Sequence, residues 1–323
     1  MTNNHDFGAT GTPPAVVLVG GANLDIVAYT DRPLVAADSN PGHVRCAPGG
    51  VARNVAHNLA LLGQCAALVS VLGDDPFGHM VRSATAAAGV DTRHCALLAG
   101  ARTATYLSLH GVDGDMAVAI NDMAILARLD AALLATLLPS VQAARCLVLD
   151  CNLHDEALAF LLGGRWQAPV LVDAVSAIKC PRLAPWLARI HTLKLNRLEA
   201  QALTGQVVQS SAQALEAAQA LHQRGVAQVV ISQGPYGVVW STRQGESGHC
   251  PARAVPVVNT SGAGDALLAG LVHSQLQGWS LARAVPWAMA CAEITLQSPV
   301  ANAPELSLAA VERQCAMAHS PSR

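Results

Sequence analysis

The sequence has little charge and few aromatic residues. Of its 323 residues, 13% are charged and 3% are aromatic, whereas about 25% charge is typical of a soluble domain. The net charge is only -2, so we expect no basic surface that could hold a nucleic-acid backbone. Hydrophobic residues make up 52% of the chain. Such a chain can bury enough apolar surface on folding to offset the entropy cost of ordering it. The composition therefore predicts a folded protein that has no nucleic-acid polymer as a partner.

Long apolar runs are also absent. A membrane-spanning helix needs about 20 mostly apolar residues, and the longest charge-free stretch, residues 54–73, is interrupted by Asn54, His57, Asn58 and Gln64. Residues 1–14 lack the basic and apolar segments of a signal peptide, and we expect them to form a flexible lead. The sequence therefore predicts a cytoplasmic protein with no membrane as a partner.

No spacing typical of metal ligands or paired cysteines occurs. The nine Cys residues are scattered without a CxxC pair, and the twelve His residues contain no HxxxH pair. The absence of these spacings argues against a disulfide framework and a zinc site. We expect the cysteines to be small core residues in a reducing compartment.

Short β-branched runs alternate with longer Ala- and Leu-rich stretches along the chain. The runs predict strands at residues 16–20, 67–72, 146–150, 170–173, 192–195, 228–232 and 255–258. The stretches predict helices at residues 51–62, 76–88, 131–138, 155–162, 197–203, 212–224 and 263–277. Apolar strands joined by helices are typical of a parallel sheet covered on both faces. We therefore predict an α/β fold with a doubly wound, mostly parallel sheet.

One segment has the alternation of a hairpin with a solvated face. TATYLSLH at 103–110 is followed by the turn sequence GVDGD and by MAVAI, which ends at residue 120; this pattern predicts two paired strands. Together with residues 26–30 and 43–46, they are expected to form a small antiparallel lid over a site. The remaining chain contains no linker, so residues 15–323 are predicted to form a single domain that includes this lid.

The strongest local signal is NTSGAGD at residues 259–265, between a predicted strand and an apolar helix. Glycines let the backbone approach a ligand, and the first amides of a helix have no internal partner and point at an anion. Asp265 could then take a proton from an attacking hydroxyl while the amides hold a transferring phosphoryl group. The alternative is a tight turn with an acidic residue that stabilises the helix dipole.

Two further glycine pairs precede polar residues. In GGVARN at 49–54, Asn54 lies four residues before Asn58, so the two amides share one helical face. They could bind sugar hydroxyls, or they could be exposed or capping amides. GGANLD at 20–25 lacks the GxGxxG spacing of a dinucleotide site, but it places Asp25 beyond the end of a strand, where α/β sheets bind ligands.

Other predicted strands end in polar or glycine-rich residues. Asn196 and Glu199 fit a capping box, which does not exclude contact with phosphate or magnesium through water. Two predicted strands end at Asp173 and at the segment 150–152. A third ends at SQGPYG, residues 232–237, which could be a plain turn or could border a nucleotide site. Polar strand ends on a single edge of the sheet favour a binding site.

GGxxxN at 49–54 and TxGAGD at 260–265, in this order and separation, resemble the signatures of the pfkB, or ribokinase-like, carbohydrate kinases. The resemblance extends from about Val16 to Ala301. Five segments are more narrowly similar to the family members that phosphorylate pseudouridine: residues 37–42, 48–63, 119–123, 150–152 and 196–200. The resemblance implies a three-layer α/β/α sandwich with a small β-sheet lid that often serves in dimerisation, so we expect a homodimer. It also implies that ATP with Mg²⁺ phosphorylates the 5′-hydroxyl of a nucleoside.

The resemblance assigns roles to individual residues. Asp265 would be the catalytic base, and Gly262, Ala263 and Gly264 would form the anion hole. Glu199 would hold Mg²⁺ through water. The nucleoside-binding residues would be Asp25, Gly49, Gly50 and Asn54, to which we add Thr105, Asn121, Asp122 and Asn152 as hypothetical contacts of the base. The residues that bind ATP and its phosphates would be Asp173, Lys194, Asn196, Ser232, Gly234 and Gly237.

The sequence departs from the family pattern at three positions. Asn259 stands where the family usually has Asp, which weakens the implication that a monovalent cation such as K⁺ binds near this loop. Leu195 and Ala174 stand where the family commonly has proline; these differences affect the backbone and leave the proposed base unchanged. Three alternatives are a ribokinase-type sugar kinase, a catalytically silent sugar-binding regulator and a nucleotide-dependent oxidoreductase. The intact Asp265 and its glycines disfavour the regulator, and the missing GxGxxG disfavours the oxidoreductase.

Overall fold

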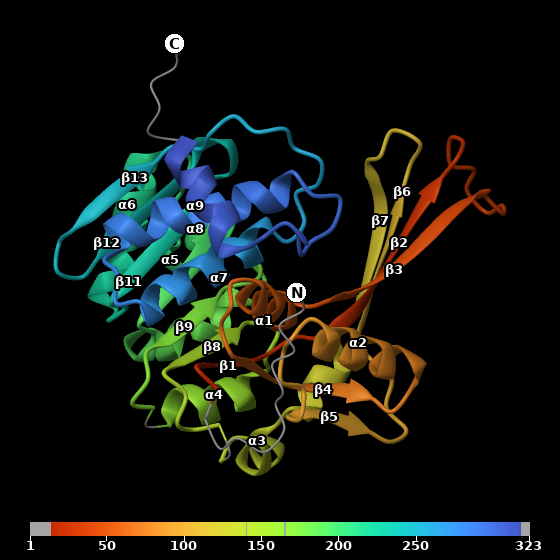
Figure 1. Ribbon diagram of the computed structural model, residues 1–323, viewed down its shortest axis with the longest axis horizontal. Helices are drawn as coiled ribbons and strands as arrows, with labels where there is room; N and C mark the ends of the chain where they lie inside the picture. The colour runs from red at the N-terminus through yellow and green to blue at the C-terminus, as the bar shows by residue number, and fades with distance from the viewer. Residues whose placement is uncertain (1–13, 140, 165, 318–323) are drawn as a thin grey trace.

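The computed structural model describes residues 14–139, 141–164 and 166–317, so nearly all of the predicted lead lies outside the described residues. These residues form a large body and an arm that projects from one side of it (Figure 1). The body contains a nine-stranded sheet and the arm a four-stranded sheet. The predicted α/β class, with a mostly parallel sheet and a small β-sheet lid, is confirmed.

The strand order of the large sheet is β13-β12-β11-β10-β9-β8-β1-β4-β5. Six predicted strands are present: β1 (Val16–Val19), β4 (Ala66–Gly73), β8 (Cys146–Asp150), β9 (Val170–Asp173), β10 (Thr192–Asn196) and β11 (Gln228–Ser232). Three strands were not predicted: β5 (Cys95–Leu98), β12 (Val238–Thr242) and β13 (Ser247–Cys250). All neighbouring pairs from β5 to β11 are parallel, whereas β12 and β13 add antiparallel strands at one edge.

Helices cover both faces of this sheet. The predicted helices are α1 (Val51–Leu61), α2 (Pro76–Ala87), α3 (Ala131–Leu137), α4 (Asp155–Gly163), α5 (Arg197–Thr204), α6 (Ser211–Gln223) and α7 (Ala263–Leu276). The structure adds α8 (Leu281–Leu296), α9 (Leu308–Met317) and the 3-10 helices η1 (Ala124–Arg128), η2 (Cys180–Arg189) and η3 (Gly234–Tyr236). In β1, Val17 belongs to the core cluster that includes residues of α4 and α6, whereas Leu18 belongs to the cluster that includes residues of α1 and α7. This alternation produces the three layers.

No helix among the described residues is both long enough and apolar enough to cross a membrane.

The strand expected at residues 255–258 is absent. The segment runs as an irregular loop, in which Val257 and Val258 are exposed. Pro256 has no N–H to donate to a strand ladder, and Pro251 lies just before the segment. The NTSGAGD motif therefore follows a loop rather than a strand, although α7 begins where the sequence predicted.

The lid sheet consists of β2 (Asn23–Thr30), β3 (Gly42–Gly49), β6 (Thr105–His110) and β7 (Met116–Asp122), in the order β3-β2-β6-β7. The pairs β2–β3 and β6–β7 are antiparallel as predicted, but the central pair β2–β6 is parallel. The prediction of a purely antiparallel lid is therefore wrong. The reason is that β2 and β6 both leave the body at their first residues, Asn23 and Thr105, and run outward side by side (Figure 1).

Candidate active site

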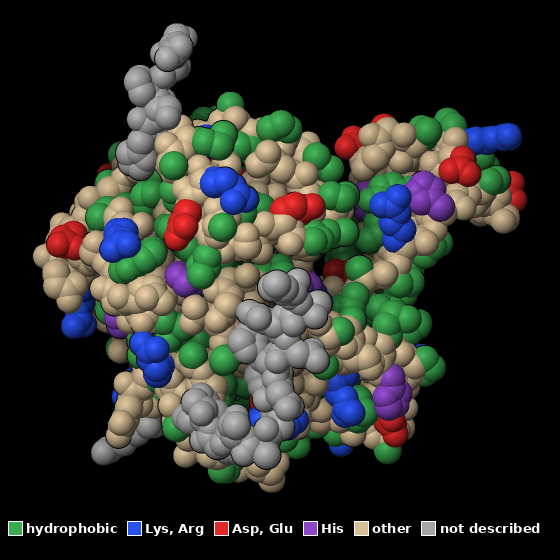
Figure 2. Space-filling model, viewed as in Figure 1, with side chains coloured by type: hydrophobic (Ala, Val, Ile, Leu, Met, Phe, Trp, Pro, Cys, Tyr) green, Lys and Arg blue, Asp and Glu red, His purple; other side chains and the backbone are tan. Residues whose placement is uncertain are grey.

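The polar strand ends meet at one edge of the large sheet. Asp150, Asp173, Asn196 and Ser232 are the last residues of β8, β9, β10 and β11, which are consecutive neighbours in the sheet. The first turns of α1 and α7 and the base of the lid come to the same edge, as the contacts below establish. In the space-filling view, an open notch separates the lid arm from the body (Figure 2).

The start of α7 is shaped by close contacts of its glycines. Gly262 has a φ of 80° and precedes the helix, and a Cβ at this position would lie 2.1 Å from the carbonyl oxygen of Ala301. Only glycine fits there without strain. No side chain caps the first amides of α7, so they remain available to an anion. A Cβ on Gly264 would lie 2.9 Å from Nζ of Lys194, which places an ammonium group beside this turn.

Asp265 lies in the first turn of α7. Its Oδ2 accepts a hydrogen bond of 2.8 Å from Nδ2 of Asn54, in the first turn of α1. Burial, and then the negative charge of Asp173, raise the pKa of Asp265 from 3.8 to about 7. A carboxylate with a pKa near neutrality is suited to act as a general base.

Lys194 lies among a group of carboxylates. Its Nζ donates a 2.9 Å hydrogen bond to Oδ2 of Asp173, and both side chains are buried. Burial alone would lower the pKa of Lys194, but the negative charges of Asp173, Glu199 and Asp265 outweigh it and raise the pKa. The ammonium is therefore charged, and it lies between the end of β9 and the first turn of α7.

Asn196 and Glu199 form the capping box that the sequence predicted for α5. Oδ1 of Asn196 accepts from the Glu199 amide, while Oε1 and Oε2 of Glu199 accept from Nδ2 and the backbone N–H of Asn196. No cluster of three His, Cys, Asp or Glu residues suited to a metal occurs within the described residues. Mg²⁺ keeps several waters and binds through few carboxylates. Glu199 is buried and both of its carboxylate oxygens accept from Asn196, so a role in holding Mg²⁺ through water stays a prediction.

The glycine pair before α1 packs closely against the start of the lid. A Cβ on Gly49 would lie 2.2 Å from Oδ2 of Asp25, and one on Gly50 would lie 2.4 Å from the carbonyl oxygen of Gly21. Asn23 donates to Oδ1 of Asp25 at 2.6 Å. Burial raises the pKa of Asp25, opposed by the bond from Asn23. The partly exposed Asp25 carboxylate thus borders the Gly49–Gly50 turn.

Asn54 and Asn58 do not act as a pair toward a ligand. Asn58 is fully buried, and its Oδ1 accepts from Nδ2 of Asn302; its own Nδ2 is buried without a partner in the described structure. Only Asn54 reaches Asp265. The idea of two amides that jointly bind sugar hydroxyls is therefore wrong, because helix α1 packs too closely against the segment after α8.

A buried arginine, which the sequence reasoning missed, holds Asn54 in place. The guanidinium of Arg53 donates to Oδ1 of Asn54 at 3.0 Å, to Oδ1 of Asn302 at 2.6 Å and to the carbonyl oxygen of Pro48 at 3.1 Å. Burial lowers the pKa of Arg53 to about 10, opposed by the charge of Asp25. The only sequence signal was that Arg53 is the one charged residue of helix α1.

The lid places Asn121, but not Thr105, on the face that carries Asp25. Asp25 pairs with Tyr106, and Tyr106 pairs with Asn121, so these three side chains share one face of the lid. Thr105 pairs with the buried Leu24 and with Asp122, on the other face. Tyr106 was missed because the alternation of strand residues shows two faces without showing which one faces the site.

The end of β11 forms a turn around η3. The hydroxyl of Ser232 donates to the carbonyl oxygen of Leu195 at 3.3 Å. Gly237 has a φ of 92°, and a Cβ there would lie 2.1 Å from the carbonyl oxygen of Cys250, so the turn itself requires this glycine. Gly234 has a positive φ and open space around it, which leaves room for a ligand.

Asp150, which was predicted only to form the polar end of a strand, is a second organising residue. Its carboxylate accepts three hydrogen bonds of 2.9 Å from the backbone N–H groups of Gly21, Ala52 and Asn152. Burial raises its pKa although these hydrogen bonds oppose the effect. Asp150 thereby joins the turn after β1, the start of α1 and the end of β8.

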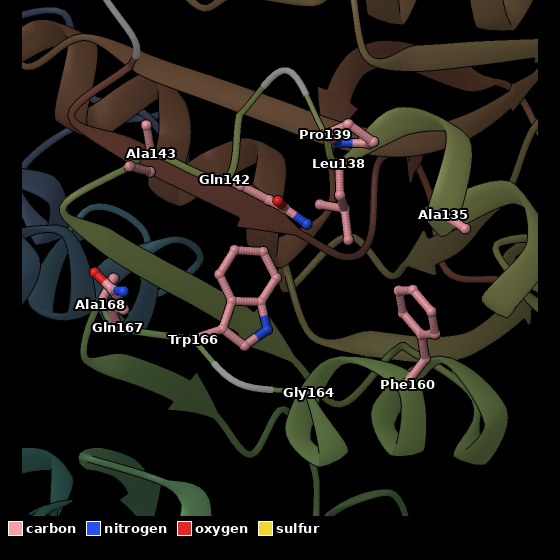
Figure 3. Close-up of a pocket in the computed structure, with 11 residues that line it drawn as sticks. Ala135, Leu138, Pro139, Gln142, Ala143, Phe160, Gly164, Trp166, Gln167 and Ala168 are labelled. Atoms are coloured by element: carbon pink, nitrogen blue, oxygen red, sulfur yellow. The ribbon is translucent and has the colours of Figure 1, made fainter.

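A cavity of about 530 Å³ lies elsewhere, between α3, α4 and the segments that lead into β8 and β9 (Figure 3). Among the described residues, its lining includes Phe160, Trp166, Gln142 and Gln167. The lining residues precede β8 and β9, so the cavity lies at the opposite edge of the sheet from Asp150 and Asp173. It contains none of the predicted site residues.

Comparison with known proteins agrees with this arrangement. The model of the pfkB family of carbohydrate kinases matches residues 14–307. The chain belongs to the pfkB family of carbohydrate kinases. It is therefore a phosphotransferase that acts on hydroxyl groups, as the sequence predicted.

Individual relatives place the chain within this pfkB family. It is 42% identical over 296 residues to a pseudouridine kinase of Escherichia coli (strain K12), covering 92% of this chain and 95% of that protein. It is 40% identical over 291 residues to the uncharacterized sugar kinase YeiI of the same strain, covering 90% and 80%. The structure of Arabidopsis thaliana ribokinase complexed with ribose and ATP superposes with a TM-score of 0.83 at 21% identity, covering 94% and 99%, which shows the shared fold.

Proposed function

We propose that this kinase transfers the γ-phosphoryl group of ATP to the 5′-hydroxyl of pseudouridine. The observation that carries the proposal is the start of α7, where uncapped amides, Lys194 and the carboxylate of Asp265 converge. The choice of pseudouridine is supported by the 42% identity to a pseudouridine kinase. The proposal treats residues 15–323 as one catalytic domain, with Asp25 on the lid and Asp265 in the body.

In the proposed reaction, Asp265 accepts the proton of the 5′-hydroxyl. The hydroxyl oxygen then bonds to the γ-phosphorus, the bond to the β–γ bridging oxygen breaks, and ADP leaves. The amides of Gly262, Ala263 and Gly264 stabilise the charge on the transferring group, because they are preorganised and uncapped. Asp25, Gly49, Gly50 and Asn54 hold the ribose.

The nucleotide is proposed to lie along the ends of β9, β10 and β11. Lys194 neutralises phosphate charge, Asp173 orients Lys194, and Asn196 borders the phosphates. The turn around η3 would border the adenine nucleotide through Ser232, Gly234 and Gly237. When bound, Mg²⁺ would supply positive charge to the phosphate oxygens, and Glu199 would hold its water ligands.

We further propose that two copies of the chain associate through the lid. On the face opposite Asp25, residues from all four lid strands form an apolar surface, defined as Ile26, Ala28, Val44, Cys46, Leu107, Leu109, Val118 and Ile120. Val44 and Ile120 are more than 60% exposed. A second copy could cover this surface with its own equivalent surface.

The lid proposal is tested by sedimentation of the wild type and two variants. Wild type and the control Val112→Asp, in the turn between β6 and β7, are expected to be dimers. Ile120→Asp is expected to be monomeric, because it places a charge within the apolar surface. A monomeric wild type, or a fully dimeric Ile120→Asp variant, would contradict the proposal.

The main rival is a ribokinase-type sugar kinase of the same family, supported by 40% identity to an uncharacterized sugar kinase. Coupled measurement of ADP release with pseudouridine, uridine, ribose and fructose separates the two. We expect the highest kcat/KM with pseudouridine; a higher value with ribose would favour the rival. A silent regulator would release no ADP with any substrate.

A further inference from the structure

Lys179 and Asn152 form a polar pair that the proposed catalytic roles leave unexplained. Nζ of Lys179, in the loop after β9, donates a 2.6 Å hydrogen bond to Oδ1 of Asn152, just after β8. Asn152 is largely buried, with 9% of its surface exposed, and Lys179 is partly exposed. The two residues therefore form a fixed pair at the same edge of the sheet as Asp150 and Asp173.

The pair lies next to the glycines that border the proposed ribose site. A Cβ on Gly21 would lie 2.9 Å from Nδ2 of Asn152, and a Cβ on Gly50 would lie 2.4 Å from the carbonyl oxygen of Gly21. Gly21 is thus in contact with Gly50 on one side and Asn152 on the other. A ribose bound at Gly50 would carry its base within the neighbourhood of Asn152 and Lys179.

Lysine is rare in this chain. The sequence has 20 Lys plus Arg residues, of which only Lys179 and Lys194 are lysines. They follow or belong to the adjacent strands β9 and β10, at the same edge of the sheet. Lysine offers a compact ammonium with rotatable donors, which the planar guanidinium of arginine cannot replace. Both lysines of the chain therefore lie at the edge of the sheet that carries the predicted site residues.

The loop that carries Lys179 has a strained backbone. Val175 has a φ of 63°, a conformation that is unfavourable for a β-branched residue. The turn is closed by a 2.7 Å hydrogen bond from the Ser176 amide to the carbonyl oxygen of Ala174, and Oδ1 of Asp173 accepts from the Val175 amide. Such strain persists where the surrounding structure enforces it, often at binding sites.

The free polar atoms of the pair are donors. Oδ1 of Asn152 is engaged by Lys179, whereas Nδ2 of Asn152 and two N–H groups of the ammonium have no partner among the described residues. A ligand at this position must therefore supply an acceptor. A pyrimidine base carries two carbonyl oxygens, and a free sugar carries no base.

We infer that Lys179 and Asn152 bind the carbonyl oxygen of a pyrimidine base beside its glycosidic bond. The inference rests on the proposed nucleoside kinase function. Uridine and pseudouridine both present a carbonyl next to that bond, so the pair recognises the pyrimidine without distinguishing the two nucleosides. The extra N–H of pseudouridine needs an acceptor instead, and Oδ1 of Asn152 already accepts from Lys179. Asn121 of the lid is the candidate that remains on the Asp25 face.

The test compares Lys179→Met with the wild type in steady-state kinetics with pseudouridine, uridine and ribose. Methionine keeps the apolar stem and removes the donors. We expect kcat/KM to fall about 10- to 100-fold for both nucleosides, since a charged hydrogen bond is lost, mostly through KM. The values for ribose and the KM for ATP are expected to stay within about 2-fold. Arg182→Met, which removes a charge three residues along the chain, serves as the matched control.

Three results would overturn the inference. An equal loss with ribose and the nucleosides would place Lys179 at the sugar or in folding, while the proposed function would stand. Unchanged nucleoside kinetics in a variant with an unchanged melting temperature would remove Lys179 from the site. A wild type that phosphorylates neither nucleoside would refute the proposed function, and this inference with it.

Discussion

Replacing the carboxylate of Asp265 should make the protein more stable while it abolishes turnover. Burial and the negative charge of Asp173 raise the pKa of Asp265 from 3.8 to about 7, so its ionisation in the folded state destabilises the protein. An acid whose pKa is raised in the folded state binds more protons when folded. The free energy of unfolding therefore falls as the pH rises from about 4 to about 7, and the full cost remains above that window.

The size of the effect follows from the same pKa. The gap between 3.8 and about 7 corresponds to about 4 kcal/mol. This value is an upper bound because Asp265 is partly exposed, so we expect about 1 to 3 kcal/mol. Asp265→Asn keeps an oxygen that can accept from Asn54, so the variant should lose the charge without losing this hydrogen bond.

Urea unfolding of the wild type and Asp265→Asn at about pH 5 and about pH 8 measures the effect. The variant should exceed the wild type by about 1 to 3 kcal/mol at the higher pH and by less at the lower pH. ADP release should fall by about 100-fold or more. A variant that is less stable at about pH 8, or one with near wild-type turnover, would refute the reasoning.

Asp75 provides a control of opposite sign. Burial opposes its ionisation, but hydrogen bonds from Thr103 and Gly78 outweigh it and lower the pKa of Asp75. Its contribution is therefore present above the ordinary pKa and lost as the pH falls. Asp75→Asn should lose stability at about pH 8 and lose less near pH 4, while turnover stays close to that of the wild type.

Two further predictions concern the same turn. For the free enzyme, kcat/KM should rise with pH through about pH 7, because Asp265 must be deprotonated to accept a proton; a flat profile across that range in a buffer series would contradict its role as the base. Gly262→Ala should lower both turnover and the melting temperature, since its Cβ would strike the carbonyl oxygen of Ala301, at a cost of about 1 to 3 kcal/mol. The control Gly278→Ala has a positive φ of 69° but open space, so it should lose stability through backbone strain alone and keep its turnover; equal turnover in the two variants would refute the contact argument.

The sequence predicted the elements that depend on local pattern. Apolar runs such as 146–150 and 170–173 became strands with the expected bounds, because a sheet covered on both faces requires continuous apolar residues. Strand β13 was missed because it lies at the edge of the sheet, where SGHC at 247–250 has no apolar pattern. Strand β12, VVWST, is buried and mostly apolar, so its signal was present in the sequence and was overlooked. The error at 255–258 came from weighing valines above Pro256, whose missing N–H decided the outcome.

The acidic residues of the candidate site could be predicted from the sequence. The contacts that position them could not. Asp173 and Asp265 stood out because charges are few and these lie at ends of predicted elements. Arg53 meets Asn302 across 249 positions of sequence, and no local pattern encodes such a contact. The same limit applies to the lid, where the parallel pairing of β2 with β6 fixes which face carries Asn121.

The charges around Lys194 also act on Asp265, the proposed base. Asp173, Glu199 and Asp265 all act on this one ammonium, so the group carries more negative than positive charge before any nucleotide arrives. Part of that excess is relieved by the proton that Asp265 retains up to about pH 7. Bound phosphates add further negative charge, so their counter-charge must arrive with them or come from the uncapped amides of α7. Lys194 already balances part of the carboxylate charge, so the proposed function needs the α7 amides and a cation that accompanies the nucleotide to supply the remaining positive charge.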